Sequence, residues 1–327
     1  MDSELNKAVI KKVLESIPKH IKPIDYLMDI LCISRESAYR RMRNDIAFTL
    51  DEVAKLSFKL NFSVDNVIGV QNIKERFFLD LQTEQLVDPK SNFLSTLQDY
   101  YQYIEWIHKT PHVEAMASLN RLNLFFLAQS PMLFKFYYYT WIHHTYNVPV
   151  NCPFSKIKLL PEVIDLKNQF KAVASSFNNC SYILDRNIFE NIVREIQYYR
   201  GRNLLSAEEV LELKGELSEL VNYFQKLMQN GQNDSGFVYN FYLSMLNVEL
   251  NASYASFGKE VASQYWISSV NPIIIRNYEI SNLHKNWIES MKKSSILITH
   301  SNELLQVEFI NKQREHIENL SKDLVYY

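Results

Sequence analysis

Glycine and cysteine are both scarce in this sequence. Six glycines occur in 327 residues, whereas β-sandwiches and glycine-rich nucleotide folds need many tight turns and close backbone approaches. The scarcity therefore favours a helix-rich chain. The three cysteines, Cys32, Cys152 and Cys180, are odd in number and far apart. This pattern predicts reduced thiols in a cytosolic protein rather than a disulfide framework or a structural metal site.

Long apolar runs and a surplus of charge are also missing. No stretch reaches the ~20 apolar residues that span a bilayer, and the N-terminus contains no apolar leader core. We therefore expect a cytoplasmic protein with no membrane partner. The formal net charge is −2, so any binding of a polyanion has to come from a local arrangement of Lys and Arg. Hydrophobic residues make up 47% of the chain, which is enough to bury a sizeable core.

No recognisable catalytic spacing is present. The sequence contains no G-x-S-x-G, Walker-type or G-x-G-x-x-G motif. His143 and His144 are neighbours, and adjacent helical residues point ~100° apart, so one helix cannot direct both at one metal. His108 and His112 have a zinc-compatible spacing, but Pro111 between them disfavours a helix there. We therefore predict that the protein is not an enzyme and needs no metal or cofactor.

The N-terminal part of the chain has the pattern of five short helices. Apolar periodicity and turn residues place these helices at 5–16, 24–31, 35–44, 50–60 and 64–68. Ser34 and Ser63 stand at N-cap positions, and Thr49 with Glu52 forms a capping box. The sequence therefore predicts a compact helical domain over residues 1–70.

Residues 71–327 are expected to form a larger and mostly helical body. Helical periodicity runs through 93–108, 113–128, 132–146, 188–199, 207–229, 282–293 and 303–320. Between 236 and 277 the pattern changes to β-branched and aromatic residues with partial alternation, which predicts two to four strands. The expected fold is therefore mainly α, with a small β-sheet insertion near 236–277. An aromatic run over 134–141 indicates core packing, a dimer interface or the wall of a ligand pocket.

The most informative pattern lies within residues 24–69. In the segment ISRESAYRRMR, Ser34 caps a helix whose inner face is formed by Ala38 and Met42, four residues apart. The helical period then fixes the opposite face. That face offers guanidinium, carboxylate and amide groups, which match base edges in the major groove. The candidate DNA-binding residues, including the cap and the margins of the face, are Ser34, Arg35, Glu36, Ser37, Tyr39, Arg40, Arg43 and Asn44.

The run ISRESAYRRMR followed by FTLDEVAKLSFKLNFSVDNVIG resembles the lambda-repressor-like (Cro/XRE) helix-turn-helix family. The resemblance covers residues 1–70 and implies that helix 34–44 lies in the major groove while helix 24–31 crosses the DNA backbone. By position, it assigns base contacts and phosphate contacts to different residues. Those assigned to bases are Arg35, Glu36, Ser37 and Arg40, and those assigned to phosphate are Arg43 and Asn44.

The sequence departs from the family pattern at two positions. Cys32 occupies the turn position where glycine is usual, and Met28 stands where a small residue is common. Both departures bear on the angle between the two helices of the motif.

These features favour a sequence-specific transcription regulator that binds double-stranded DNA. An arginine-rich helix face alone is typical of solvated surface, so the hypothesis depends on the capped helices around it. Residues 1–70 carry 11 basic and 10 acidic residues, a formal charge of +1. Phosphate contacts of one domain are then weak, and we expect a homodimer.

Residues 71–327 would supply dimerisation and the sensing of an unknown ligand or protein partner. Two alternatives stay open: an enzyme targeted to DNA, and a scaffold that uses the module for protein contacts.

We predict that residues beyond 70 hold the homodimer together, because they contain most of the aromatic residues and the small N-terminal domain has few apolar residues to expose. Light scattering on a fragment lacking residues 1–70 should give the mass of a dimer. A monomeric fragment at tens of micromolar would contradict this arrangement.

Overall fold

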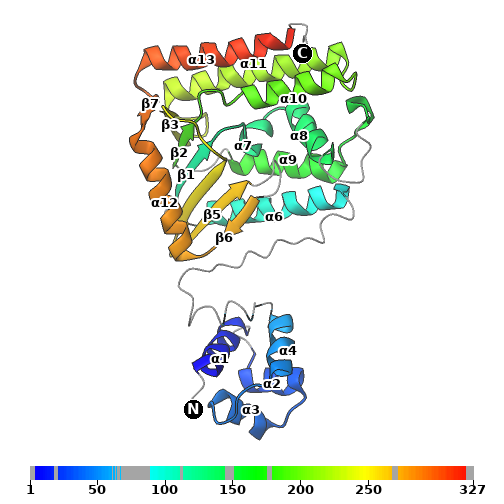
Figure 1. The fold of residues 1–327 in the computed structure, drawn as a ribbon, viewed down its shortest axis with the longest axis vertical. Coiled ribbons are helices and arrows are strands. Elements are labelled where there is room, and N and C mark those ends of the chain that lie inside the picture. The colour runs from blue at the N-terminus through cyan, green and yellow to red at the C-terminus, as the bar shows by residue number, and fades with distance from the viewer. Residues whose placement is uncertain are drawn as a thin grey trace. The chain divides into compact units, whose positions relative to one another are not determined.

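The computed structural model describes residues 4–17, 21–60, 62, 64, 67, 89–110, 113–143, 151–174, 179–266 and 272–321. The chain divides into two compact units, Met1–Gln82 and Thr83–Tyr327 (Figure 1). Each unit has a hydrophobic core of its own. The predicted domain boundary at residue 70 lies outside the described residues.

The described part of the N-terminal unit is helical. Its helices are α1 (Glu4–Ser16), α2 (Pro23–Leu31), α3 (Arg35–Met42) and α4 (Leu50–Leu60). They agree with the first four predicted helices to within two residues at each end. Val13, Leu27, Ala38 and Leu56 have no exposed surface, so each helix contributes one fully buried residue to the core. The fifth predicted helix, 64–68, lies for the most part outside the described residues.

The second unit, which we call the body, alternates helices and strands. Its helices are α6 (Pro89–Lys109), α7 (Leu124–Leu127), α8 (Pro131–His143), α9 (Pro161–Ala174), α10 (Glu190–Gly201), α11 (Ala207–Asn230), α12 (Tyr278–Lys293) and α13 (Glu303–Glu318), with short 3₁₀ turns at Phe154–Lys156 and Asn319–Ser321. Its strands are β1 (Glu114–Leu119), β2 (Asn179–Leu184), β3 (Val238–Ser244), β4 (Ala252–Phe257), β5 (Glu260–Trp266), β6 (Pro272–Ile275) and β7 (Ser295–Leu297).

A mixed seven-stranded sheet runs through the body in the order β6-β5-β4-β1-β2-β3-β7. Strands β1, β2 and β3 lie side by side and parallel, and the other neighbouring pairs are antiparallel. Parallel neighbours need a crossover connection. Helices α7–α9 provide the crossover from β1 to β2, and α10 and α11 provide the one from β2 to β3.

The prediction of a mainly α, or all-α, fold is wrong, because the body is α/β. Strands β3–β6 do fall within 236–277, but β1, β2 and β7 lie outside it, and the sheet spans the body rather than forming a small insertion. The predicted helix 113–128 contains β1, whose sequence EAMASL is rich in helix-forming residues. Pairing with β2 on one edge and β4 on the other overrides that local preference. Strand β2 is largely buried and therefore lacks the polar alternation that reveals a strand.

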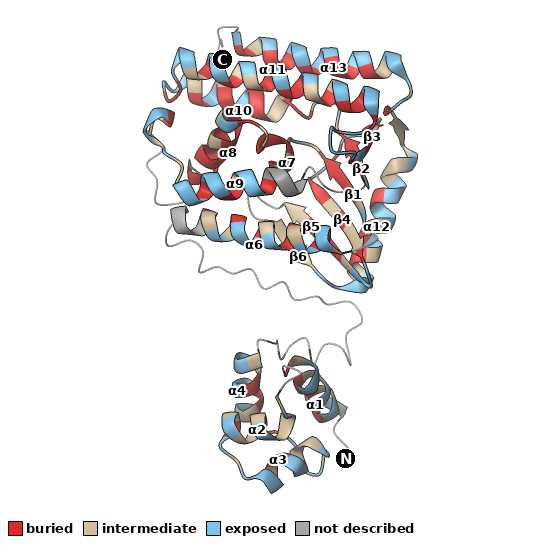
Figure 2. Ribbon diagram, turned by 180° about the vertical axis from the view of Figure 1, so that it is seen from behind, coloured by how far each residue is buried: buried red, intermediate tan, exposed pale blue. Residues whose placement is uncertain are grey.

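The two faces of the sheet are covered by different helices. Side chains such as Leu119, Tyr182 and Phe241 point to the main core, which contains residues of α6–α11 and α13. Met116 and Ile183 point the opposite way and pack with Ile288 of α12. Figure 2 shows the resulting pattern on α11 and α13, which carry buried residues on one side and exposed residues on the other. The body is thus a three-layer α/β/α arrangement with most helices on one face.

The aromatic side chains of α8 belong to the main core. Those with at most 5% of their surface exposed are Phe134, Phe136, Tyr138, Tyr139 and Trp141. Of the interpretations that the sequence leaves open for this run, core packing is therefore the one observed for these five residues.

Gln313 is a polar side chain buried in that core. Its Nε2 donates to the carbonyl oxygens of Arg186 at 2.7 Å and Phe309 at 3.1 Å, and its Oε1 accepts from the backbone N–H of Phe189 at 3.3 Å. Gln313 has no exposed surface, and its bonds with Arg186 and Phe189 tie α13 to the chain that follows β2.

We expect Gln313→Leu to lower the free energy of unfolding of the body by about 1–3 kcal/mol, because the buried N–H of Phe189 loses its partner. Urea denaturation followed by tryptophan fluorescence measures this loss, since all four tryptophans lie in the body. The exposed neighbour Glu308 provides a control, and Glu308→Gln should change the unfolding free energy by less than about 0.5 kcal/mol. Equal effects of the two substitutions would show that the bonds of Gln313 contribute nothing.

Candidate nucleic-acid interface

The turn between α2 and α3 directs the chain into the candidate helix. Cys32 has φ 54° and ψ 45°, the left-handed conformation that usually favours glycine. Ser34 follows in an extended conformation and accepts a hydrogen bond from the backbone N–H of Ser37 at 3.3 Å. The predicted cap is thus confirmed. Although position 32 is a cysteine, its backbone adopts the conformation that glycine usually adopts in this turn.

One face of α3 anchors the helix. Ala38 is fully buried and Met42 is partly buried, and both pack in the core of the N-terminal unit as the sequence predicts. The remaining exposed residues of the predicted set share the outer side of the helix and its two ends. We call them the recognition face: Ser34, Arg35, Glu36, Tyr39, Arg40 and Arg43. The guanidinium of Arg35 lies 5.9 Å from the centroid of the Tyr39 ring, within the range of a cation–π contact.

The other two predicted contact residues are engaged inside the unit. The hydroxyl of Ser37 accepts a hydrogen bond from Nη1 of Arg41 at 2.6 Å. Asn44, which has φ 66°, accepts at Oδ1 from Nδ2 of Asn6 at 2.5 Å. Both are only partly exposed, so the structure places them in the framework that supports the recognition face.

Arg41 differs from Arg40 and Arg43 because it forms a largely buried ion pair. Its Nε donates to Oε2 of Glu52 at 2.9 Å and its Nη2 to Oε1 at 2.7 Å, which makes a two-bond pair between α3 and α4. The two side chains are only 12% and 15% exposed. Glu52 also accepts from the backbone N–H of Thr49, while the Thr49 hydroxyl accepts from the backbone N–H of Glu52, so the predicted capping box is present.

The electrostatics of Glu52 follow from these contacts. Burial alone would raise the pKa of its carboxyl group, but hydrogen bonds from Arg41 and Thr49 and the positive charge of Arg41 hold the pKa below its usual value. The carboxylate therefore stays ionised and fixes the Arg41 guanidinium toward α4.

Asn6 is a structural residue that the sequence reasoning missed. It is 5% exposed, donates to Asn44, and accepts at Oδ1 from the backbone N–H of Phe48 at 3.0 Å. It thereby joins α1 to both ends of the loop between α3 and α4. Its position three residues before the buried Val9 was the available signal, since an amide on an apolar helix face needs a partner.

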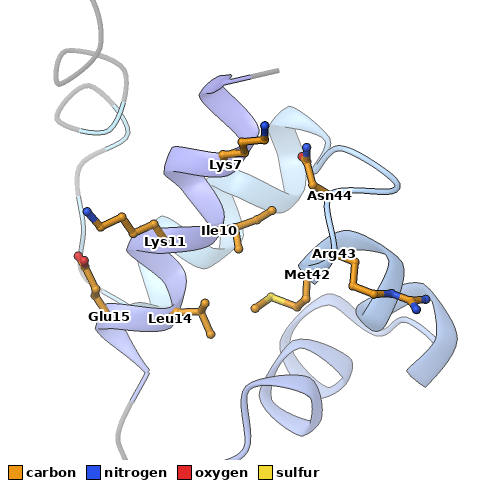
Figure 3. A pocket seen from close by; sticks show the side chains of 8 residues that line it. All are labelled: Lys7, Ile10, Lys11, Leu14, Glu15, Met42, Arg43 and Asn44. Carbon is orange, nitrogen blue, oxygen red and sulfur yellow. The ribbon is translucent and has the colours of Figure 1, made fainter. Parts of the chain in front are cut away.

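A groove of about 430 Å³ lies between α1 and the C-terminal end of α3 (Figure 3). Ile10, Leu14 and Met42 point into it, whereas the guanidinium of Arg43 points away. Lys7 and Lys11 of α1 also line the groove and are exposed. The exposed Glu15 lines it as well, so these three side chains of α1 add a net formal charge of +1 (two lysines less one glutamate) near the C-terminal end of α3. The sequence reasoning did not select the lysines.

None of the described parts contains three or more His, Cys, Asp or Glu side chains grouped to hold a metal, and no described helix is long and apolar enough to cross a membrane. Burial raises the pKa of Cys180 to about 12, so its thiol stays protonated. Of the two histidine pairs considered from the sequence, His112 and His144 lie outside the described residues.

Comparison of the chain with protein-family models, with curated proteins and with solved structures finds no match. The resemblance to the helix-turn-helix family therefore stays an expectation from the sequence.

We expect Glu52→Gln to destabilise the N-terminal unit by about 1–3 kcal/mol at neutral pH, because Arg41 loses its charged partner. The carboxyl pKa is lower in the folded state than in the unfolded state, so its contribution is present above about pH 4.5 and is lost as pH falls through the folded-state pKa. Hydrogen exchange of the α3 and α4 amides follows this unit directly. Asp51→Asn, an exposed neighbour, is the matched control, and an equal loss in both variants would contradict the role of the pair.

Proposed function

We propose that this protein is a transcription regulator that reads double-stranded DNA with the recognition face of α3. The observation that carries the proposal is that neighbouring arginines of α3 differ in burial and in their partners. Arg41 is held by Glu52 and is largely buried, whereas Arg40 and Arg43 are exposed on a short helix that is capped at its start and buried on its inner side. Arg43 has only an exposed ion pair, with Asp45 at 3.4 Å, which a phosphate can replace at little cost. A helix held in this way presents the Cα positions of its outer side chains in a fixed arrangement, which suits base readout in the major groove.

The residues of the recognition face divide into two roles. Arg40 lies near the middle of the face and is suited to a two-bond contact with guanine, and Glu36 can accept from cytosine. Arg43 lies at the C-terminal end of α3, where a phosphate contact fits better. Lys7 and Lys11 on α1 lie beside that end and extend the positive charge toward the DNA backbone.

The active form would be a homodimer on two half-sites. The N-terminal residues carry almost equal numbers of basic and acidic groups, so a single unit gains little from counterion release. Two linked units add their contacts and read a symmetric operator. The body would hold the pair together and sense a signal.

A protein-binding scaffold is the second candidate, and one observation favours it. Leu50 and Phe58 on α4 are 80% and 85% exposed, and their spacing places them on the same side of the helix. Exposed apolar side chains of this size suit a protein contact. The same side chains could also serve a DNA-binding dimer, so the two candidates differ in what the arginines do.

We predict that Arg40→Ala and Arg43→Ala differ in kind. Arg40→Ala should weaken binding to a selected operator by about 1–3 kcal/mol and leave binding to random duplex nearly unchanged, because a base contact is lost. Arg43→Ala should weaken both equally and lower the salt dependence by about one phosphate contact. Fluorescence anisotropy at several salt concentrations, on an operator obtained by in vitro selection, measures both quantities.

Arg194→Ala removes an exposed arginine from the body and is the control for charge. It should leave both affinities unchanged. If Arg40→Ala reduces operator and random binding to the same extent, or reduces neither, the recognition face does not read bases and the scaffold candidate is favoured.

A further inference from the structure

A cavity of about 60 Å³ lies inside the body between α6 and the face of the sheet that points to the main core. Its walls come from α6, from the central strands β1, β2, β4 and β5, and from the segment that follows β1. One water needs roughly 10–15 Å³ when volume is measured in this way. The cavity therefore has room for about four to six water-sized groups.

The wall of this cavity is aromatic and uncharged. Tyr100, Tyr182 and Trp266 contribute rings, and among the described residues that line it none is a Lys, Arg, His, Asp or Glu. Cys180 also lines the cavity, and its thiol stays protonated. An ionic ligand would find no countercharge here, so the cavity suits a neutral molecule.

Two hydrogen-bonding groups of the wall have no partner within the described structure. The hydroxyl of Tyr100, on a side chain 4% exposed, is buried and unpaired, and so is Nε2 of Gln264, which is 3% exposed. The Gln264 amide is oriented by Ser253, whose hydroxyl donates to Oε1 at 3.1 Å. Its Nε2 is therefore left as a donor without an acceptor.

Leaving such groups unpaired is costly. A buried hydroxyl or amide without a partner reduces stability, and an apolar side chain at the same position would avoid that loss. A core built for stability alone would carry phenylalanine at 100. The pairing of a void with two unpartnered polar groups is thus the arrangement expected for a ligand site.

A second hollow lies next to the cavity. It has a volume of about 200 Å³ and lies at the carboxyl end of β1, lined by Asn120, Arg121 and Asn251. Asn251 holds this segment by accepting at Oδ1 from the backbone N–H groups of Asn120 at 2.8 Å and Arg121 at 3.2 Å. Asn123 and Trp266 line both the hollow and the buried cavity, so the two spaces adjoin.

We propose that the buried cavity binds a small neutral carbonyl compound of about four to six non-hydrogen atoms, whose oxygen accepts hydrogen bonds from Tyr100 and Gln264. An acceptor is required because Nε2 of Gln264 can only donate. The apolar part of the ligand packs against the aromatic wall. This site is independent of the recognition face and goes beyond DNA binding.

Cyclopentanone is a suitable probe, and methylenecyclopentane has the same shape without the acceptor. Saturation-transfer NMR on the full-length protein should detect binding of the ketone with a dissociation constant on the order of 1 mM or lower. The hydrocarbon should bind about three- to tenfold more weakly, and the anion isobutyrate should not bind. Failure of the ketone to bind, with ordered water alone found in the cavity, would overturn the proposal.

Variants locate the probe. Tyr100→Phe and Gln264→Leu should each weaken ketone binding about three- to tenfold. Tyr100→Phe should also raise the Tm of the unliganded protein, which keeps the test independent of any folding defect. Ser263→Ala is the matched control, because Ser263 is a fully buried neighbour of Gln264 whose hydroxyl is likewise unpartnered within the described structure and points to the opposite face of the strand. Equal ketone affinity in all variants would place the ligand elsewhere and refute this site.

Discussion

The carboxylate of Glu52 fixes the geometry of the N-terminal unit, because four groups depend on it. It binds two nitrogens of Arg41, accepts from the backbone of Thr49 at the start of α4, and through Arg41 determines the orientation of Ser37. Helices α3 and α4 are thereby joined by charge, while Ala38 and Leu56 both lie in the core of the unit. The Arg41–Glu52 pair helps to fix the orientation of α3, and α3 carries the exposed arginines of the recognition face. None of those exposed arginines contacts Glu52.

Local signals in the sequence were sufficient for the N-terminal helices and insufficient for the sheet. Ser34 and the Thr49–Glu52 box act within one helical turn, so their effect is readable from neighbouring residues. Strand β1 is defined by pairing with residues far along the chain, and its own composition favours a helix. Helices bounded by clear caps and turn residues were therefore predicted well, and strands defined by pairing with distant residues were not.

Within the candidate site, the sequence identified the helix but could not sort its polar residues. Arg40, Arg41 and Arg43 are equivalent by composition, and the residue that distinguishes Arg41 lies eleven positions away on another helix. Asn44 likewise looks like a surface amide until Asn6 is placed against it. Which polar groups are free depends on tertiary contacts, and a single helix does not contain that information.

The pairing of β1 with β4 also has a consequence for biosynthesis. Asn251, which holds the end of β1, follows Asn120 by 131 residues, and at typical elongation rates the ribosome needs roughly ten seconds to make that length. Helices α1–α4 are complete much earlier, and the bonds of Asn6 that join α1 to the loop before α4 span only 38 and 42 residues. We therefore expect the recognition face to form first on the ribosome, while the edge of β1 that pairs with β4 is still unpaired. An open strand edge is a template for association with other chains, so we expect the nascent body to be prone to aggregation in the interval before β4 emerges.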